Sequence, residues 1–222
     1  MKRFRNRAEA GRELAAALMK LKLARPVVYA LPRGGVPVGV EVARSLGAPL
    51  DLVLVRKLGA PGHAELAIGA VVDGETPHMV IKSDIVRALG VSEAQIEDAR
   101  RAALIEIARR RAVFDDVLDP VDPRGRSAII VDDGVATGAT MEASVEALKS
   151  SGAARIIVAA PVMPVEAATL FKKIADGVVC LETPTPFLAV GAHYVDFRQL
   201  DDRDVIDLLS AVKFGGETAR DS

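Results

Sequence analysis

Two adjacent acids and a run of small residues form the most distinctive polar group in this chain of 222 residues. Asp132 and Asp133 end an apolar run, and a loop from Gly134 to Thr140 leads from them into a helix-compatible segment. Backbone amides, threonine hydroxyls and the positive end of a helix dipole suit such a loop to phosphate. Because two carboxylates repel a bare phosphate, they must serve another part of the ligand, such as sugar hydroxyls or a hydrated divalent metal.

A second group of this kind is the sequence Pro32-Arg33-Gly34-Gly35. The fork-shaped guanidinium of Arg33 suits phosphate oxygens. The two glycines permit either a close approach of the backbone to a ligand or a positive φ. An ordinary tight turn would explain the glycines but not an arginine between proline and glycine, so this loop is a second candidate for phosphate binding.

Both loops follow apolar runs of strand length. The run from Val27 to Leu31 lacks alternation and predicts a buried strand of a parallel sheet. Strands alternate with helices along the chain, which predicts one α/β domain over residues 1–214 with a doubly wound, mostly parallel sheet. Ligands bind such sheets at the carboxyl ends of the strands, where both loops would lie. Residues 215–222 are expected to form a disordered tail.

The basic residues near the N-terminus are interpreted as solvated. Asn6 and Glu9 predict a helix start with a reciprocal cap, and leucines at helical spacing extend this helix to about Lys22. Contact with phosphate is the alternative for the arginines in and before this helix, which are Arg3, Arg5, Arg7 and Arg12.

Residues 51 to 58 predict a single strand with a basic end at Arg56 and Lys57. The segment from Gly59 to Glu65 is rich in glycine and proline, and it predicts a flexible connection that is a candidate lid. Arg56 and Lys57 would then neutralise the charge of a departing phosphate group. A solvated hairpin tip with a basic flank is the alternative.

Two further segments differ in composition from the alternating pattern. Residues 78–118 are expected to be a helical insertion, because Ser92 and Gln95 form a capping box that opens a helix to about Phe114. Residues 183–200 hold three of the eight aromatic residues, which suit a planar ring or, equally, close the edge of the core. These aromatic residues are Phe187, Tyr194 and Phe197.

The stretch from Asp132 to Thr140, together with the upstream loop, resembles the PRPP-binding motif of type I phosphoribosyltransferases. The resemblance implies that Asp132 and Asp133 hold ribose hydroxyls and contact Mg²⁺ only indirectly, through those hydroxyls or water. It implies that the 5′-phosphate is bound by Val135, Ala136, Thr137, Gly138, Ala139 and Thr140. Arg33, Gly34 and Gly35 look like the family's pyrophosphate loop.

The same resemblance extends to the rest of the chain. It implies catalytic roles for Arg33, Arg56 and Lys57 beside a mobile loop, and a small hood at residues 183–200. That hood would contact the acceptor through Phe187, Tyr194 and Asp196. The implied function is transfer of a 5-phosphoribosyl group from PRPP to a nitrogenous acceptor, such as a nucleobase, with release of pyrophosphate. The alternative is a PRPP-binding sensor without catalysis.

One loop position departs from the 6-oxopurine enzymes of the family. Where those enzymes carry an aspartate that handles the purine proton, this chain has Ala136. The sequence VATGAT is closer to the adenine-type loop, so salvage of hypoxanthine or guanine is disfavoured and no general base is assigned. The whole pattern looks like that of a bacterial group of phosphoribosyltransferases without an assigned acceptor.

Composition sets the remaining expectations. The net charge is −1 and no aromatic residues interleave with the arginines of residues 109–111, so nucleic acid is not an expected partner. The apolar runs are short and the chain has one cysteine, Cys180, so we expect no membrane span and a cytoplasmic location. The expected partners are PRPP and a small-molecule acceptor, and association of identical chains is left open.

Overall fold

The structure is a computed structural model that describes residues 3–74, 77–114 and 116–217. Its helices are α1 (Arg7–Leu18), α2 (Gly35–Leu46), α3 (Ser83–Leu89), α4 (Glu93–Phe114), α5 (Ala139–Ser150), α6 (Val165–Ile174), the 3₁₀ helix η1 (Val190–His193) and α7 (Asp202–Glu217). Its strands are β1 (Pro26–Ala30), β2 (Leu50–Leu52), β3 (Val55–Ala60), β4 (His63–Val72), β5 (His78–Ile81), β6 (Ser127–Val131), β7 (Arg155–Val162) and β8 (Gly177–Glu182).

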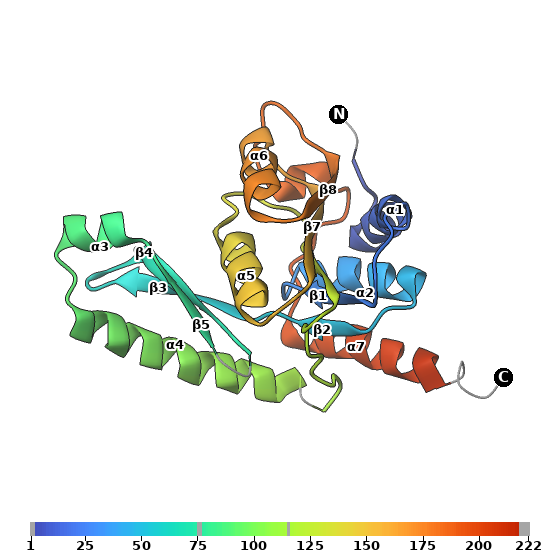
Figure 1. Ribbon diagram of the computed structural model, residues 1–222. Coiled ribbons are helices and arrows are strands. Elements are labelled where there is room, and N and C mark those ends of the chain that lie inside the picture. Colours follow the sequence, from blue (N-terminus) through green and yellow to red (C-terminus); the bar gives the residue numbers. More distant parts are fainter. Residues whose placement is uncertain (1–2, 75–76, 115, 218–222) are drawn as a thin grey trace.

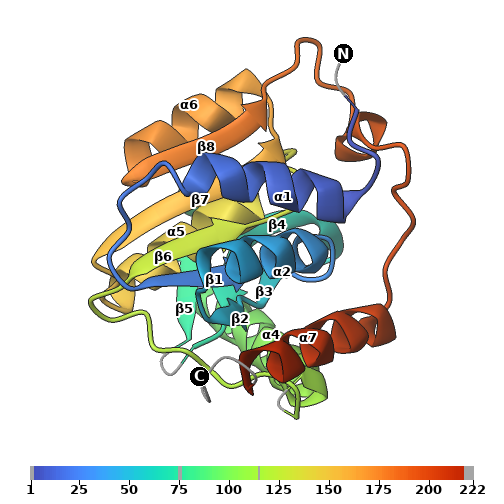
Figure 2. The same ribbon diagram turned by 90° about the vertical axis from the view of Figure 1, so that its right-hand side faces the viewer.

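The predicted parallel sheet is confirmed. Five parallel strands lie in the order β2-β1-β6-β7-β8, with α1 and α2 on one face and α5 and α6 on the other (Figures 1 and 2). The chain runs outward from β1 to β2 and later returns to place β6 on the other side of β1. The strand order therefore reverses between β1 and β6, which is where open α/β sheets bind their ligands.

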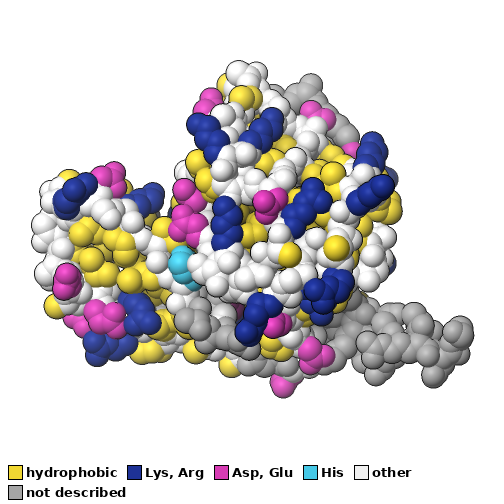
Figure 3. All heavy atoms as spheres, in the orientation of Figure 1, with side chains coloured by type: hydrophobic (Ala, Val, Ile, Leu, Met, Phe, Trp, Pro, Cys, Tyr) yellow, Lys and Arg dark blue, Asp and Glu magenta, His cyan; other side chains and the backbone are white. Residues whose placement is uncertain are grey.

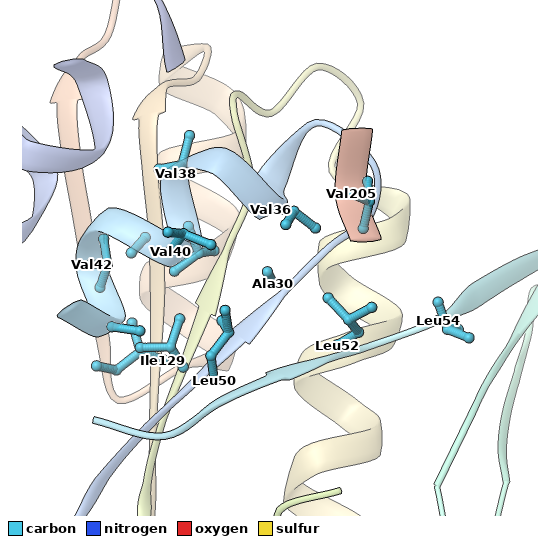
Figure 4. Close-up of a cluster of buried hydrophobic side chains, with 14 of the residues drawn as sticks. Ala30, Val36, Val38, Val40, Val42, Leu50, Leu52, Leu54, Ile129 and Val205 are labelled. Atoms are coloured by element: carbon cyan, nitrogen blue, oxygen red, sulfur yellow. The ribbon is translucent and has the colours of Figure 1, made fainter. Parts of the chain in front are cut away.

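The core divides between the two faces of this sheet, because successive side chains of a strand point in opposite directions. On one face, Ala30 of β1 and Ile129 of β6 pack with valines of α2 and with Val205 of α7 (Figure 4). On the other face, Tyr29 and Ile130 pack with apolar residues of α5 and α6. Burial on both faces explains why these strands lack alternation in the sequence.

The predicted single strand over residues 51–58 is wrong, since two short strands in different sheets replace it. β2 belongs to the parallel sheet, whereas β3 pairs antiparallel with β4, and β4 pairs with β5. A tertiary hydrogen bond accompanies the break: the Leu54 amide donates to the Asp73 carboxylate at 2.7 Å instead of continuing the ladder of β2. The chain thereby leaves the first sheet and enters the second.

The flexible connection predicted from Gly59 to Glu65 is also wrong. β3 continues to Ala60 and β4 begins at His63, which leaves a turn at Pro61 and Gly62. Gly62 has a φ of 74°, a conformation that glycine adopts at little cost. The solvated hairpin that was the alternative therefore describes the backbone of this segment.

Residues 78–118 contain β5, α3 and α4. The predicted capping box is confirmed, because the Ser92 amide donates to the Gln95 side chain at 2.9 Å and the Gln95 amide donates to Ser92 Oγ at 3.3 Å. α3 was not predicted. At the C-terminus, α7 reaches Glu217, so residues 215–217 are helical where a disordered tail was expected, and residues 218–222 lie outside the described residues.

A buried charge cluster joins the two sheets beside a cavity of about 1060 Å³. Arg111 of α4 lies 3.1 Å from Asp51 of β2 and 3.5 Å from Asp73, which follows β4. Burial raises the pKa of Asp73 to about 6, although Arg111 opposes the rise. Among the described residues, none donates a hydrogen bond to Asp73 Oδ2.

Basic and acidic side chains are interspersed over the face shown in Figure 3, and they do not form a broad patch of one sign there. No helix within the described residues is long and apolar enough to span a membrane.

Candidate active site

The two loops singled out in the sequence meet at the reversal point of the sheet. Ala30 of β1 pairs with Val131 of β6, and the Leu31 amide donates to the Val131 carbonyl at 2.9 Å. Both strands therefore end side by side, and the loops that follow them start from neighbouring positions. The peptide bond between Pro32 and Arg33 is cis.

The two glycines are required by contact between these loops. A Cβ at Gly34 would overlap the carboxylate of Asp133, and a Cβ at Gly35 would lie 2.6 Å from the Val131 carbonyl oxygen. Neither glycine has a positive φ. The glycines thus permit a close approach of the backbone, but the group that approaches is the acid-pair loop of the same chain.

The acid pair is largely enclosed. The Asp133 side chain is 11% exposed, and its Oδ2 accepts a hydrogen bond of 2.7 Å from Nε of Arg7. Asp132 is half-buried and its Oδ1 accepts from the Asp133 amide at 2.8 Å. The Asp133 carbonyl accepts from the Tyr194 hydroxyl at 2.6 Å. Backbone and carboxylate of Asp133 are both fixed by partners distant in the sequence.

Burial raises the pKa of Asp132 well above its ordinary value, and the charge of Asp133 raises it further. Burial also raises the pKa of Asp133, while the hydrogen bond from Arg7 opposes this rise. The pair therefore holds a proton more readily than ordinary aspartates do. A ligand that donates hydroxyl hydrogens or carries positive charge to this point favours the ionised form.

The loop after the acid pair presents a row of free backbone amides. Val135 donates to the Val162 carbonyl, but no described backbone carbonyl accepts from the amides of residues 136–140. α5 begins directly behind them, and its dipole adds positive potential at the same point. Gly138 has a φ of 79°, and a Cβ there would lie 3.0 Å from the ring of Phe171. The resulting pattern suits an anion with several oxygens.

Beside the acid pair lies a cavity of about 460 Å³. It contains three of the predicted site residues, Arg33, Gly34 and Asp133, from the two loops. The remaining lining residues come from α1 and from the segment before α7, and they are Arg7, Phe197, Gln199 and Leu200. Arg33 is about one-third exposed, and its nearest carboxylate oxygen among the described ion pairs is 4.0 Å away on Asp202.

The interpretation of Arg7 as part of a solvated face is wrong. Asn6 caps α1 as predicted, by accepting from the Glu9 amide at 2.9 Å, which places Arg7 at the first helical position. From there its side chain reaches inward, and only 10% of it is exposed. The reciprocal bond differs from the expected one, because the Glu9 carboxylate accepts from the Arg5 amide. Nothing in the sequence separates Arg7 from the other arginines nearby.

The segment from Thr183 to Leu200 covers the acid-pair loop. A Cβ at Gly134 would overlap the side chain of Val190 in η1, so this side chain packs directly on the loop backbone. Tyr194 is 1% exposed and lies between the rings of Phe4 and Phe197, at centroid distances of 5.6 and 5.0 Å. For Tyr194, the alternative that the aromatic residues close the core edge therefore describes the structure.

The other predicted acceptor contacts lie outside the described lining of the smaller cavity. The Phe187 ring stacks on His193 at 5.9 Å, and it remains half-buried. Asp196 is exposed and accepts from the Arg198 amide. Phe197, by contrast, does line the cavity, with the Arg7 guanidinium 3.9 Å from its ring centroid. The sequence indicated it through its membership of the aromatic group.

Arg56 and Lys57 are exposed on β3, and they are not among the described residues that line the cavity beside the acid pair. Arg56 is close enough to α4 to act on the Glu106 carboxyl. The pKa of Glu106 is lowered to about 2, mainly by the hydrogen bond from Arg109, and the charge of Arg56 contributes. The structure therefore brings Arg33 to the acid pair but leaves the other two predicted catalytic cations on the second sheet.

A metal held by the protein alone would need a third ligand. No group of three or more histidine, cysteine or acidic side chains comes together in the described part of the chain. The acid pair offers two carboxylates, the kind of oxygen ligand that Mg²⁺ takes.

Comparison with known proteins decides the family. The sequence model described as phosphoribosyl transferase domain matches residues 2–195. This chain belongs to the phosphoribosyltransferase family. The match includes α1, both loops and η1, and it ends at residue 195, before Phe197 and the other lining residues that precede α7.

Individual relatives agree with this assignment. "Putative phosphoribosyl transferase Rv0571c" and "Putative phosphoribosyl transferase MT0597", from two strains of Mycobacterium tuberculosis, are each 45% identical over 209 residues. The alignments cover 94% of this chain and 47% of each relative, so the chain spans about half the length of these curated relatives. Among solved structures, TT1426 from Thermus thermophilus is 43% identical, with a TM-score of 0.83 over 94% of this chain and 98% of that one.

Proposed function

We propose that this chain transfers the 5-phosphoribosyl group of PRPP to a nitrogen atom of a small-molecule acceptor and releases pyrophosphate. One observation carries the proposal: at the reversal point of the sheet, the paired strands β1 and β6 end side by side and are followed by the Arg33 loop, the acid pair and the free amides of residues 136–140, with Gly34 directly against Asp133. PRPP has two phosphate-bearing ends separated by a ribose with two hydroxyls. Its three parts match the three groups of the site in kind and in order.

The 5′-phosphate would lie at the start of α5, where amides and the Thr137 and Thr140 hydroxyls are available. The ribose hydroxyls would donate to Asp132 and Asp133, and the pyrophosphate would lie along residues 33–35. This arrangement explains why carboxylates and an anion site are adjacent: the acids contact neutral hydroxyls and not phosphate oxygens.

Mg²⁺ is proposed as the cofactor. Its donor set would come from pyrophosphate oxygens, ribose hydroxyls and water, with Asp132 and Asp133 holding those hydroxyls and waters. When bound, it would supply positive charge beside the pyrophosphate. This role fits an acid pair without a third protein ligand among the described residues.

In the transfer step, a bond forms between the acceptor nitrogen and C1′ of the ribose while the bond from C1′ to the pyrophosphate oxygen breaks. The electron pair of the broken bond leaves with pyrophosphate, and the acceptor nitrogen afterwards loses its proton to solvent or a base. Arg33 would stabilise the negative charge on the leaving group, with Arg56 and Lys57 contributing if the β3–β4 hairpin approaches. Ala136 offers no carboxylate, so an acceptor that is already nucleophilic is favoured.

Calorimetry with PRPP tests the site assignment. We expect PRPP to bind in the presence of Mg²⁺, and the double variant Asp132→Asn, Asp133→Asn to lose most of that affinity. Each lost charge-assisted hydrogen bond should cost about 1.5–3 kcal/mol. A matched control, Asp84→Asn with Asp98→Asn, removes two acids from α3 and α4 and should bind as the wild type does. Equal affinity of both double variants would refute the assignment.

Release of pyrophosphate against a panel of nucleobases and amines tests catalysis. A signal with any acceptor, lost in the acid-pair double variant, would support a transferase. Tight PRPP binding without release across a broad panel would favour the sensor instead. The panel also addresses Phe187, because a stacking role predicts that Phe187→Ala raises the acceptor KM.

A further inference from the structure

Arg7 connects three parts of the molecule that are far apart in the sequence. Its Nε donates to Asp133 Oδ2 at 2.7 Å, and one terminal amino group donates to the Arg198 carbonyl at 3.0 Å. Its guanidinium also covers the ring of Phe197 at 3.9 Å. A single side chain of α1 therefore contacts both the acid pair and the segment that covers it.

The backbone before α1 reinforces this connection. Phe4 forms a parallel bridge with Tyr194, in which the Phe4 amide donates to the His193 carbonyl at 2.9 Å and the Val195 amide donates to the Phe4 carbonyl at 2.8 Å. The Asp196 amide donates to the Arg5 carbonyl at 2.9 Å. Residues 4–7 are thereby fixed along residues 193–198, and Arg7 extends from the end of this pairing toward Asp133.

The electrostatic consequence follows from burial. A carboxylate as enclosed as that of Asp133 resists ionisation, because burial raises its pKa. Arg7 is the cation that compensates this cost, with a hydrogen bond as well as with charge. A planar guanidinium fixes the direction of the oxygen that it binds, and an ammonium group does so less well.

We propose that Arg7 is a positioning residue that pairs with the Asp133 carboxylate and orients it to accept from a ribose hydroxyl. Its contacts with Phe197 and the Arg198 carbonyl make the orientation of Asp133 depend on the placement of the covering segment. The inference rests on the proposed function, because it assigns Arg7 to the ribose-binding step of PRPP.

A double-mutant cycle read out by PRPP affinity in the presence of Mg²⁺ tests the inference. The variants are Arg7→Gln, Asp133→Asn and their combination, and the control is Arg12→Gln, which removes a half-exposed arginine of the same helix that lies 3.6 Å from Glu41. If Arg7 acts through Asp133, each single variant should lose about tenfold or more in affinity. The combined variant should lose no more than Asp133→Asn alone, and the control should bind normally.

Arg7→Gln leaves a buried carboxylate unpaired and is the variant that can fail to fold, whereas the combined variant removes both charges. Arg7→Lys supplies an independent measurement, since it keeps the charge and loses the fork. We expect Arg7→Lys to lose severalfold in affinity in the wild-type background and nothing in the Asp133→Asn background. A purely structural role would instead lower the melting temperature without this dependence on Asp133.

The outcomes separate the two proposals. If the wild type binds PRPP and Asp133→Asn weakens binding, but the Arg7 substitutions add fully to it or change nothing, the positioning role is overturned and the proposed function stands. If the wild type does not bind PRPP, both proposals fall. A coupled loss supports both.

Discussion

The carboxylate of Asp133 lies against Gly34 so closely that no side chain fits between them. Gly34 belongs to the loop after β1, and Asp133 belongs to the loop after β6. The contact therefore links the two loops that we propose to bind opposite ends of PRPP. Any group larger than hydrogen at position 34 must move Asp133 or open the space between β1 and β6.

Gly34→Ala should reduce PRPP affinity by about tenfold or more, because the displaced Asp133 carboxylate loses its hydrogen bond from Arg7 or its alignment with the ribose. Calorimetric titration with PRPP measures this effect. Gly177→Ala is a matched control, because a Cβ there would meet only the flexible end of Ile157, at 2.8 Å. Wild-type affinity in Gly34→Ala would contradict the proposed contact between the loops.

PRPP affinity should rise with pH through the raised pKa of Asp132. Burial and the neighbouring Asp133 raise the pKa of Asp132, and burial raises that of Asp133 against the hydrogen bond from Arg7. Ribose hydroxyls donate more strongly to ionised carboxylates than to protonated ones, so binding at lower pH should release protons. Titration in two buffers with different ionisation enthalpies counts these protons.

Asp132→Asn serves as the control for this pH dependence, because PRPP itself also titrates. The variant should retain the contribution of the ligand and lose that of the acid pair. Proton release that is identical in wild type and variant would show that the pair binds PRPP without a change in ionisation.

Asp73→Asn should raise the free energy of unfolding, relative to that of the wild type, more at neutral pH than at acid pH. Folding raises the pKa of Asp73 from 3.8 to about 6, because the folded protein binds the proton more tightly than the unfolded chain does. The protonated side chain therefore contributes most to the free energy of unfolding below pH 3.8, and this contribution is lost as the pH rises to about 6. The gain of the variant over wild type should increase by about 2–3 kcal/mol between pH 4 and pH 7. Urea unfolding at both values measures it, and a difference that does not change with pH would contradict the assignment.

Replacing Arg56 and Lys57 together by alanine should slow pyrophosphate release about 100-fold or more while weakening PRPP binding less, if they stabilise the leaving group. Both lie on β3, outside the described lining of the cavity, so this role requires movement of the hairpin. The control is Lys82→Ala with Arg87→Ala, which removes two exposed cations from the same part of the molecule. Equal rates in both variants would leave Arg33 as the cation that acts on pyrophosphate.

Local sequence indicated the parallel sheet and the two loops that we propose to bind PRPP. Buried strands such as β1 and β6 are recognisable because burial on both faces requires continuous apolar residues. The acids and small residues after β6 are recognisable because a phosphate loop needs free amides at a helix start. These features depend on neighbours in the sequence, so residues 26–35 and 127–140 carry them without reference to the rest of the chain.

The division of residues 51–58 was decided by tertiary contacts. Nothing local distinguishes Leu52 from Leu54, and the hydrogen bond from the Leu54 amide to Asp73 determines where the chain changes sheets. The turn between β3 and β4 likewise depends on pairing between strands, whereas its glycine and proline alone were equally compatible with a long loop.

The sequence by itself thus indicated the family, the sheet and the residues that we propose to bind PRPP. Only the tertiary structure decided which partners hold those residues. Arg7 looks like its neighbouring arginines until α1 is packed against the sheet, and Tyr194 looks available for stacking until the segment from Thr183 closes over Asp133. The physical reason is that burial and charge pairing across 126 and 61 residues of chain depend on packing, which no local pattern records.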